Sequence, residues 1–386
     1  MSNGNNKGIQ FVITTMVFLL LFLLFYFIFI KKDDEEGISA EDFEIAFIND
    51  GVLSLSDIKG ENRINRVHGS FVVWAPSGDS LYYIDNYSKL KRYDLETKKS
   101  EDVAVNVSTF KVSPEGDAIA FVEDTENPSL KIVGAAGGES ISDIPSGRSP
   151  MWLNDGEGLV YIKDGDIYTV KRNGTGTKEL FTADAVDLDV SPDGKFVLFT
   201  EEGEGESRLV LGKIDGGSKK VIKKVSFAEK PTEASPLGFS LPRFLGQTNE
   251  ALFAYNDAKG GRIFKINPDD ESIEGVCMEG GPIFSLSISP DDDRIAYFYM
   301  SKTDLPSFKK KGGEGDKEVD MEFTPADLKS ELNKMLLDME DEGTLTGDKV
   351  NKNSVTRVLD SDRIKIVDLK RGVTWFAGSG QYPSLR

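Results

Sequence analysis

Side chains with nucleophilic or metal-binding chemistry are few in this sequence. The 386 residues contain one histidine, His68, and one cysteine, Cys277. One cysteine excludes an intramolecular disulfide, a CxxC redox pair and a cysteine-based zinc site, and one histidine excludes a metal site built from several histidines. His68 stands in a linker into a strand, so we interpret it as a structural or surface residue. We therefore expect no catalytic residue, no cofactor and no metal.

Carboxylates are plentiful by contrast. The chain has 65 Asp and Glu against 46 Lys and Arg, with a formal net charge of −19. A field of this sign repels phosphate backbones and excludes nucleic acid as a partner. Three acidic clusters offer oxygen ligands for Ca²⁺, at 269–271, at 291–293 and at Asp187 with Asp189, but none has the spacing of a calcium loop. We interpret all three as solvated turns.

Residues 9–30 form an apolar segment near the start of the chain. They include fifteen uninterrupted apolar or aromatic residues, from Met16 to Ile30. At ~1.5 Å per residue the segment reaches about 33 Å, which matches a hydrocarbon core of ~30 Å. A cleaved signal peptide is the competing interpretation, but it has a shorter apolar region and a small-residue cleavage site. The sequence predicts an uncleaved transmembrane helix over 9–30, between a short tail (1–8) and an acidic linker (31–37).

A short phrase recurs along the rest of the chain: a turn built on Pro-acid-Gly, then an alternating apolar strand. Successive copies at Pro76, Pro114, Asn154 and Pro192 are 38, 40 and 38 residues apart, and a further copy stands at Pro290. Proline presets the first turn dihedral, the acid bonds its own backbone and glycine takes φ > 0 at the exit. A period of about 40 residues with short strands indicates four-stranded propeller blades. The residues assigned to these structural turns are Pro76, Gly78, Pro114, Gly116, Asp155, Gly156, Pro192, Asp193, Gly194, Pro290 and Asp291.

Two degenerate copies of the phrase complete the set. One leads into 251–255 and the other into 45–47, which makes seven turn strands. The copy that leads into 45–47 lacks an inner strand before it, and 381–386 resembles an inner strand without a following turn. The two ends would therefore share one blade, which removes the exposed edges of an open array. We predict an all-β fold, a seven-bladed β-propeller over 38–386 closed by pairing of the segment near 382–385 with 45–47.

The repeats resemble those of the TolB-type β-propeller family, in which a Ser-Pro-Asp-Gly turn precedes an Ile-Ala-Phe-like strand. The copies that carry the resemblance are 191–194, and 289–291 with 295–297. The resemblance covers about 38–386 and implies the propeller fold. Members of the family serve as periplasmic scaffolds, receptor-like domains and appendages of peptidases. The peptidases keep their catalytic residues on a separate hydrolase domain, and no segment of that size is present here.

The last blade is interrupted by an insertion of about 301–362. Within it, Thr324 as N-cap, Pro325 at the first helical position and Gly343 at the end predict a helix over 325–342. Five apolar residues share one face of this helix. They are Leu328, Leu332, Met335, Leu336 and Met339. Either the stripe packs against the rim of the propeller or it binds a partner, since methionine-bearing stripes adapt to several surfaces.

These features favour a membrane-tethered, non-catalytic propeller that acts as an interaction scaffold or ligand-binding module of the cell envelope. We expect contact with the bilayer through 9–30 and with another membrane or envelope protein; the oligomeric state stays open. The alternative is a carboxylate-dependent envelope enzyme, carbohydrate-active or peptidase-related, that uses the propeller funnel. Lys7 before the apolar segment and Lys31 and Lys32 after it give almost no charge bias. From the resemblance to periplasmic propellers, we expect a single-pass protein with a cytoplasmic N-terminus and an extracytoplasmic propeller.

Overall fold

The computed structural model describes residues 43–59, 64–203, 205–226, 237–257, 260–300, 362–379 and 381–386. The predicted membrane helix at 9–30 and the predicted insertion helix at 325–342 lie outside these residues and stay predictions. Within the described ranges every regular element is a β-strand. No helix in this part of the chain is long and apolar enough to cross a membrane.

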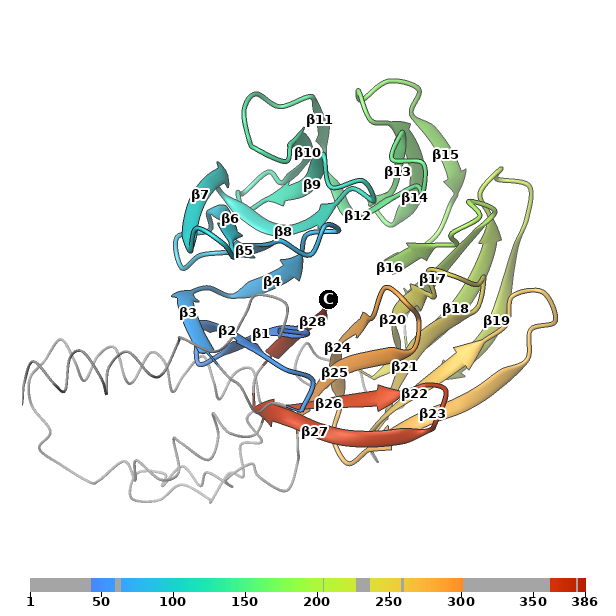
Figure 1. Cartoon of the computed structure of the whole chain (residues 1–386). Coiled ribbons are helices and arrows are strands. Elements are labelled where there is room, and N and C mark those ends of the chain that lie inside the picture. The colour runs from blue at the N-terminus through green and yellow to red at the C-terminus, as the bar shows by residue number, and fades with distance from the viewer. Residues whose placement is uncertain are drawn as a thin grey trace, which may run out of the picture. The chain divides into compact units, whose positions relative to one another are not determined.

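The strands form seven four-stranded antiparallel sheets, which we number as blades 1 to 7 (Figure 1). Blade 1 contains β4 (Phe71–Trp74), β5 (Ser80–Ile84), β6 (Leu90–Asp94) and β7 (Lys99–Ala104). Blade 2 contains β8 (Val107–Val112), β9 (Ala118–Glu123), β10 (Ser129–Gly134) and β11 (Ser142–Pro145). Blade 3 contains β12 (Gly147–Trp152), β13 (Gly158–Lys163), β14 (Asp166–Lys171) and β15 (Lys178–Phe181). Blade 4 contains β16 (Ala185–Val190), β17 (Phe196–Gly203), β18 (Glu206–Lys213) and β19 (Lys219–Ser226).

The remaining three blades complete the ring. Blade 5 contains β20 (Gly238–Phe244), β21 (Ala251–Asp257), β22 (Gly260–Ile266) and β23 (Ile273–Glu279). Blade 6 contains β24 (Ile283–Ile288), β25 (Arg294–Met300), β26 (Asp362–Asp368) and β27 (Val373–Ser379). Blade 7 contains β28 (Gln381–Leu385), β1 (Ile45–Asn49), β2 (Val52–Ser56) and β3 (Ile64–His68). The first strand of each blade lies nearest the centre in Figure 1. These inner strands contact their neighbours around the ring, and β4 meets β8 through the rings of Phe71 and Phe110.

Blade 7 joins the two ends of the described chain. β28 pairs with β1, with Ile45 opposite Leu385 and Ala46 opposite Ser384. Ser384 also reaches blade 1, because its Oγ accepts a hydrogen bond from the Trp74 backbone N–H at 3.2 Å and its carbonyl accepts one from Trp74 Nε1 at 3.0 Å. The predicted seven-bladed propeller and its closure by the two ends are confirmed.

The repeated turns gain rigidity from their serines. Ser191 Oγ donates to Asp193 Oδ1 at 2.7 Å and accepts the backbone N–H of Phe196 at 2.9 Å. Ser289 makes the same kind of contacts with Asp291 and with the Arg294 N–H. Each of these two turns is therefore held in part by its own side chains, which favours the hairpin that follows.

The core lies between neighbouring blades and consists of aliphatic and aromatic side chains. Phe181 of blade 3 stacks on Phe199 of blade 4 with ring centroids 5.9 Å apart, and both are buried. Buried polar contacts also join the blades: Asn256 of blade 5 hydrogen-bonds both the N–H and the C=O of Ile283 on the inner strand of blade 6. Such contacts fix the angle between blades and thus the positions of the inner strands.

Candidate functional site in the central cavity

The inner strands enclose a cavity of about 390 Å³. Its lining comes from β4, β8, β20, β24 and β28, which are far apart in the sequence. The volume lies in the range of about 300 to 1,000 Å³ that is typical of small-ligand sites. Aliphatic and aromatic residues both contribute to the wall, and Phe71 of blade 1 meets Tyr382 of blade 7 edge to face with centroids 5.5 Å apart.

Two of the lining strands have unusual backbone conformations at the cavity. Leu241 on β20 has φ 54° and Tyr382 on β28 has φ 50°. The pairing of β20 with β21 shifts register between Ser240 and Arg243, as in a β-bulge. Left-handed backbone is costly for bulky residues and persists where the surrounding structure enforces it, often at functional sites. The bulge changes the direction in which the following side chains point, Arg243 among them.

Arg243 is one of two cations that line the cavity, and it is paired. Its Nη1 lies 3.3 Å from Asp187 Oδ2 on β16. Burial lowers the pKa of the Arg243 guanidinium, but the charges of Asp187 and Asp189 together raise it by more. The pKa of Arg243 is therefore above its ordinary value. Asp189 Oδ2 accepts the backbone N–H of Phe244 at 2.7 Å. Burial raises the pKa of the Asp189 carboxyl, against the opposing effect of Arg243.

Lys111 on β8 is the other cation of the cavity, and it is not paired. Its ammonium makes no hydrogen bond or ion pair with any residue in the described ranges. Burial lowers the pKa of Lys111 to about 8, and the charge of Arg243 adds to this effect. The backbone at this position is fixed, because the Lys111 carbonyl accepts a hydrogen bond from Trp152 Nε1 at 3.0 Å. Lys111 therefore lines the cavity as a cation without an ion pair to the described residues, on a backbone that is held in place.

A hydroxyl group next to the cavity also has no partner. Ser285 Oγ is buried and makes no hydrogen bond to the described residues, and the same is true of Ser240 Oγ near the bulge of β20. Ser384 and Ser287 differ, since their hydroxyls accept backbone N–H groups of Trp74 and Leu385. The cavity thus combines aromatic walls with one unpaired ammonium and one unpaired hydroxyl group. Such a combination can bind an anion that carries an apolar group.

The interpretation of Asp187 and Asp189 as part of a solvated turn is wrong. Both lie on the inner strand β16, and Asp189 is only 9% exposed. The other two acidic clusters, 269–271 and 291–293, lie at turns between strands. The alternation in Ala185–Val190 could have revealed the difference, because it places both acids on one face of a strand that precedes a repeat turn.

The remaining residues singled out in the sequence lie away from the cavity or outside the described part of the chain. His68 is exposed at the end of β3. Cys277 on β23 is half-buried, and burial raises the pKa of its thiol to about 11. The stripe from Leu328 to Met339 lies outside the described residues. In the described ranges no three metal-binding side chains of His, Cys, Asp or Glu converge.

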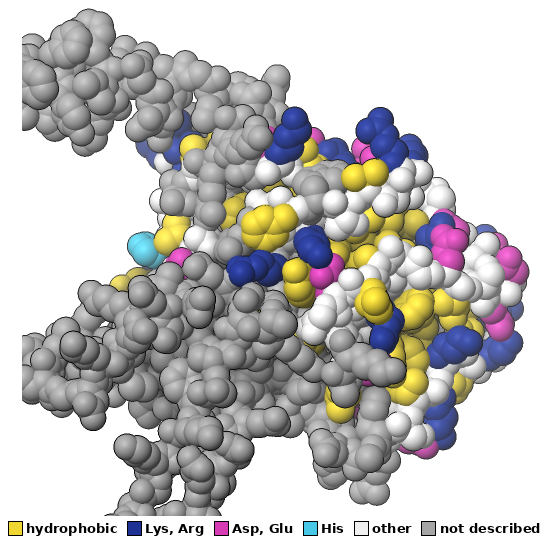
Figure 2. All heavy atoms as spheres, turned by 90° about the horizontal axis from the view of Figure 1, so that it is seen from below, with side chains coloured by type: hydrophobic (Ala, Val, Ile, Leu, Met, Phe, Trp, Pro, Cys, Tyr) yellow, Lys and Arg dark blue, Asp and Glu magenta, His cyan; other side chains and the backbone are white. Residues whose placement is uncertain are grey.

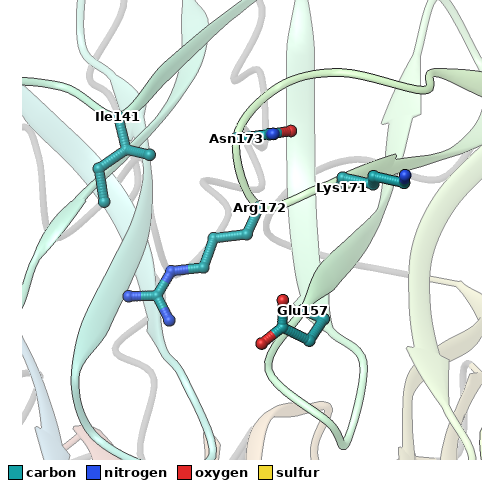
Figure 3. A pocket seen from close by; sticks show the side chains of 5 residues that line it. All are labelled: Ile141, Glu157, Lys171, Arg172 and Asn173. Atoms are coloured by element: carbon teal, nitrogen blue, oxygen red, sulfur yellow. The ribbon is translucent and has the colours of Figure 1, made fainter.

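Two other surface features carry less chemistry. A pocket of about 410 Å³ lies between blades 2 and 3, with Ile141 facing Arg172 across it (Figure 3). Arg172 is already paired there with Asp117 at 2.8 Å. On the face seen in Figure 2, Lys and Arg side chains lie among Asp and Glu side chains rather than apart from them. Neither feature offers an unpaired charge comparable with Lys111.

Comparisons with known proteins establish the fold only. No family model matches the sequence, and no curated protein matches it. A candidate TolB from Agrobacterium tumefaciens is 19% identical, with a TM-score of 0.45 over 65% of this chain and 95% of that chain. TolB from Acinetobacter baumannii is 15% identical, with a TM-score of 0.46 over 62% of this chain and 65% of that chain. An oligogalacturonate lyase in complex with manganese is 12% identical, with a TM-score of 0.50 over 87% and 84% of the two chains. At such identities the likeness to the lyase supports the propeller fold and transfers no activity.

Proposed function

We propose that this chain is a membrane-tethered, non-catalytic β-propeller that binds a partner or ligand of the cell envelope in its central cavity. The observation that carries the proposal is the composition of the cavity wall. The described residues that line it include aromatic rings, serines and two cations, but no carboxylate. A mostly apolar cavity with a few fixed polar groups is the usual form of a ligand site.

Turnover by paired carboxylates fits this geometry less well. Asp187 is held by Arg243 and by the Leu188 N–H, and Asp189 is held by the Phe244 N–H. One observation favours the enzyme alternative: the raised pKa of Asp189, whose carboxyl retains its proton to a higher pH than usual. Such a group resembles a general acid. The alternative therefore keeps a definite candidate residue that can be tested.

The binding proposal is tested by filling the cavity in the full-length protein. Ser285→Trp places a large side chain in the cavity at a hydroxyl that has no partner to lose. Ser218→Trp, in an exposed turn of blade 4, is the matched control. Both variants and the unmodified protein are used as bait in mild detergent extracts of native membranes, with mass spectrometry of bound proteins and small molecules.

We expect a stoichiometric partner or ligand with the unmodified protein and with Ser218→Trp, and its loss with Ser285→Trp. If the same partner or ligand were recovered in equal amounts with the unmodified protein and with both variants, binding would lie outside the cavity and the proposal would be contradicted. The enzyme alternative requires instead that the purified protein turn over a carbohydrate or peptide substrate, and that Asp189→Asn abolish this activity while the protein remains folded.

The membrane tether and its direction rest on the apolar segment 9–30 and are tested separately. Protease added to intact cells, or to spheroplasts where an outer membrane is present, should degrade an extracytoplasmic propeller. Full protection until lysis would reverse the orientation.

The insertion is a second contact surface in this proposal. If the stripe binds a partner, Leu332→Glu with Leu336→Glu should abolish association and leave the melting temperature nearly unchanged. If the stripe packs on the rim, the same pair buries charge and should lower the melting temperature clearly. Association that survives the double substitution would remove the insertion from the binding surfaces.

A further inference from the structure

The unpaired ammonium of Lys111 limits what the central cavity can accept. A buried ammonium without a counter-ion is costly, and its pairing with an anion recovers much of that cost. The charges of Asp187 and Asp189 act on the Lys111 ammonium, yet neither carboxylate forms an ion pair with it. Both are committed to other donors, Asp187 to Arg243 and Asp189 to the Phe244 N–H. A ligand is the remaining source of a counter-ion within the described part of the chain.

The charges around Lys111 also limit the charge of that ligand. Arg243 has an ion-pair partner in Asp187, so Lys111 is the one cation of the described lining without an ion pair. A divalent phosphate group carries two negative charges and would need a second unpaired cation, which the described lining does not offer. A single carboxylate needs only one counter-ion.

The rest of the wall favours an apolar carrier for this charge. Phe71, Phe284 and Tyr382 line the cavity, and the ring of Tyr382 is held edge to face against Phe71 and Phe298. Ser285 Oγ adds one hydroxyl group without a partner among the described residues. We propose, on the basis of the proposed function, that the cavity recognises a carboxylate carried on an aromatic or apolar segment, with Lys111 as its counter-ion.

The carboxylate can belong to a free small molecule or to a protein partner, and the chemistry of recognition is the same. The probe is 3-phenylpropanoate, compared with its neutral amide, 3-phenylpropanamide. The polar acid galacturonate tests the role of the aromatic walls. Binding is measured by calorimetry on the full-length protein in lipid nanodiscs, with protein-free nanodiscs as the blank.

We expect saturable binding of 3-phenylpropanoate at pH 7, and at least tenfold weaker binding of the amide and of galacturonate. Lys111→Met should abolish the preference for the acid over the amide. Its melting temperature should stay equal or rise, because the variant removes a buried charge. Lys213→Met, at an exposed position at the end of β18, removes the same charge from the surface and should bind as the unmodified protein does.

The pH dependence gives an independent readout. The groups around the Lys111 ammonium are Asp187, Asp189 and Arg243, and Tyr382 lines the same cavity. Because the pKa of Lys111 is about 8, its charged fraction falls about tenfold between pH 7 and pH 9, and the affinity for the acid should fall by about the same factor. This dependence should vanish in Lys111→Met, whereas a contribution from Asp189 would persist in it.

Each part of the inference can fail separately from the proposed function. Equal affinity for acid and amide, no saturable binding of the acid at millimolar concentration, or unchanged affinity in Lys111→Met would overturn the role of Lys111. If galacturonate bound as tightly as 3-phenylpropanoate, the proposal that the carboxylate is carried on an aromatic or apolar segment would be wrong. If a partner is still lost from Ser285→Trp in these cases, the cavity remains a binding site and only the ligand class is wrong. If 3-phenylpropanoate displaces a captured protein, the carboxylate belongs to that protein; if it does not, a free small molecule is the source.

Discussion

The contact between Asn256 and Ile283 should be one of the strongest single links between two blades. Asn256 is 1% exposed, and so is Ile283. Asn256 Oδ1 accepts the Ile283 N–H at 3.0 Å, and Asn256 Nδ2 donates to the Ile283 carbonyl at 3.1 Å. Asn256→Ala removes the hydrogen-bond partners of both the N–H and the C=O of Ile283. A buried N–H or C=O left unpaired costs about 1 to 3 kcal/mol, so the variant should lose about 2 to 6 kcal/mol of unfolding free energy.

This loss is large enough to measure by thermal and denaturant unfolding. For a domain of this size, 1 kcal/mol corresponds to about 2 °C, so the melting temperature should fall by about 4 to 12 °C. Asn173→Ala is the matched control, because Asn173 bonds only its own exposed turn, through Thr175. The control should change the free energy of unfolding by about 0.5 kcal/mol or less. If the two variants melt together, the two buried bonds do not join the blades as argued.

A charged substitution at the same position tests the geometry further. Asn256→Asp keeps the acceptor for the Ile283 N–H but sets a second carboxylate oxygen against the Ile283 carbonyl. Burial should raise the pKa of this aspartate in the folded state above its unfolded value of about 3.9. A raised carboxyl pKa makes the folded state less stable as pH increases above the unfolded value, so the stability that the variant loses relative to the unmodified protein should be smaller at pH 4 than at pH 7. The opposite trend would mean that water reaches the site.

Three further predictions concern blades 5 to 7. Lys365→Met should lower the free energy of unfolding by about 3 to 5 kcal/mol, because Glu279 is only 7% exposed and would keep the hydroxyl of Tyr297 as its one partner among the described residues. The double variant Lys365→Met with Glu279→Gln should recover much of this loss, as measured by denaturant unfolding. Deletion of 381–386 should lower the melting temperature far more than deletion of six residues of a free tail, and equal effects would contradict closure by this strand. The pKa of the Cys277 thiol is raised to about 11, so this thiol should be alkylated slowly at pH 8 until the protein unfolds. Folding stability should decline as pH increases from 9 toward 11, because the thiol ionises at lower pH in the unfolded state than in the folded state.

The repeat architecture could be read from the sequence because each blade begins with local chemistry. The turn at 191–194 is held by its own serine and aspartate, so a four-residue pattern was enough to locate the strand after it. Ring closure was also predictable, because one end of the chain lacks an inner strand and the other end supplies one. The resemblance to TolB-type repeats agreed with this fold and could not identify a site.

The cavity could not be predicted from the sequence, because its wall is assembled from strands of several blades. Lys111 stands in an ordinary strand between Phe110 and Val112, and nothing local distinguishes it from a surface lysine. Its unusual environment depends on Arg243 of blade 5, which only the ring brings within reach. Asp187 and Asp189 were misread because two acids in a short segment are more common in turns than on an inner strand. The alternation around them was the one local signal.

The pairing of β28 with β1 has a consequence for the order of folding. Ile45 and Leu385 are 340 residues apart in the sequence but directly opposite each other in the sheet. The entropy of loop closure grows by about 0.6 kcal/mol per doubling of length, so this contact costs about 3 kcal/mol more to form than a hairpin of roughly ten residues. Blades 1 to 6 contain only strands that follow one another along the chain, and they can form before the ends meet. Blade 7 would then be the last sheet to assemble and the first to open, with amide hydrogens of β28 and β1 exchanging through partial opening rather than through global unfolding.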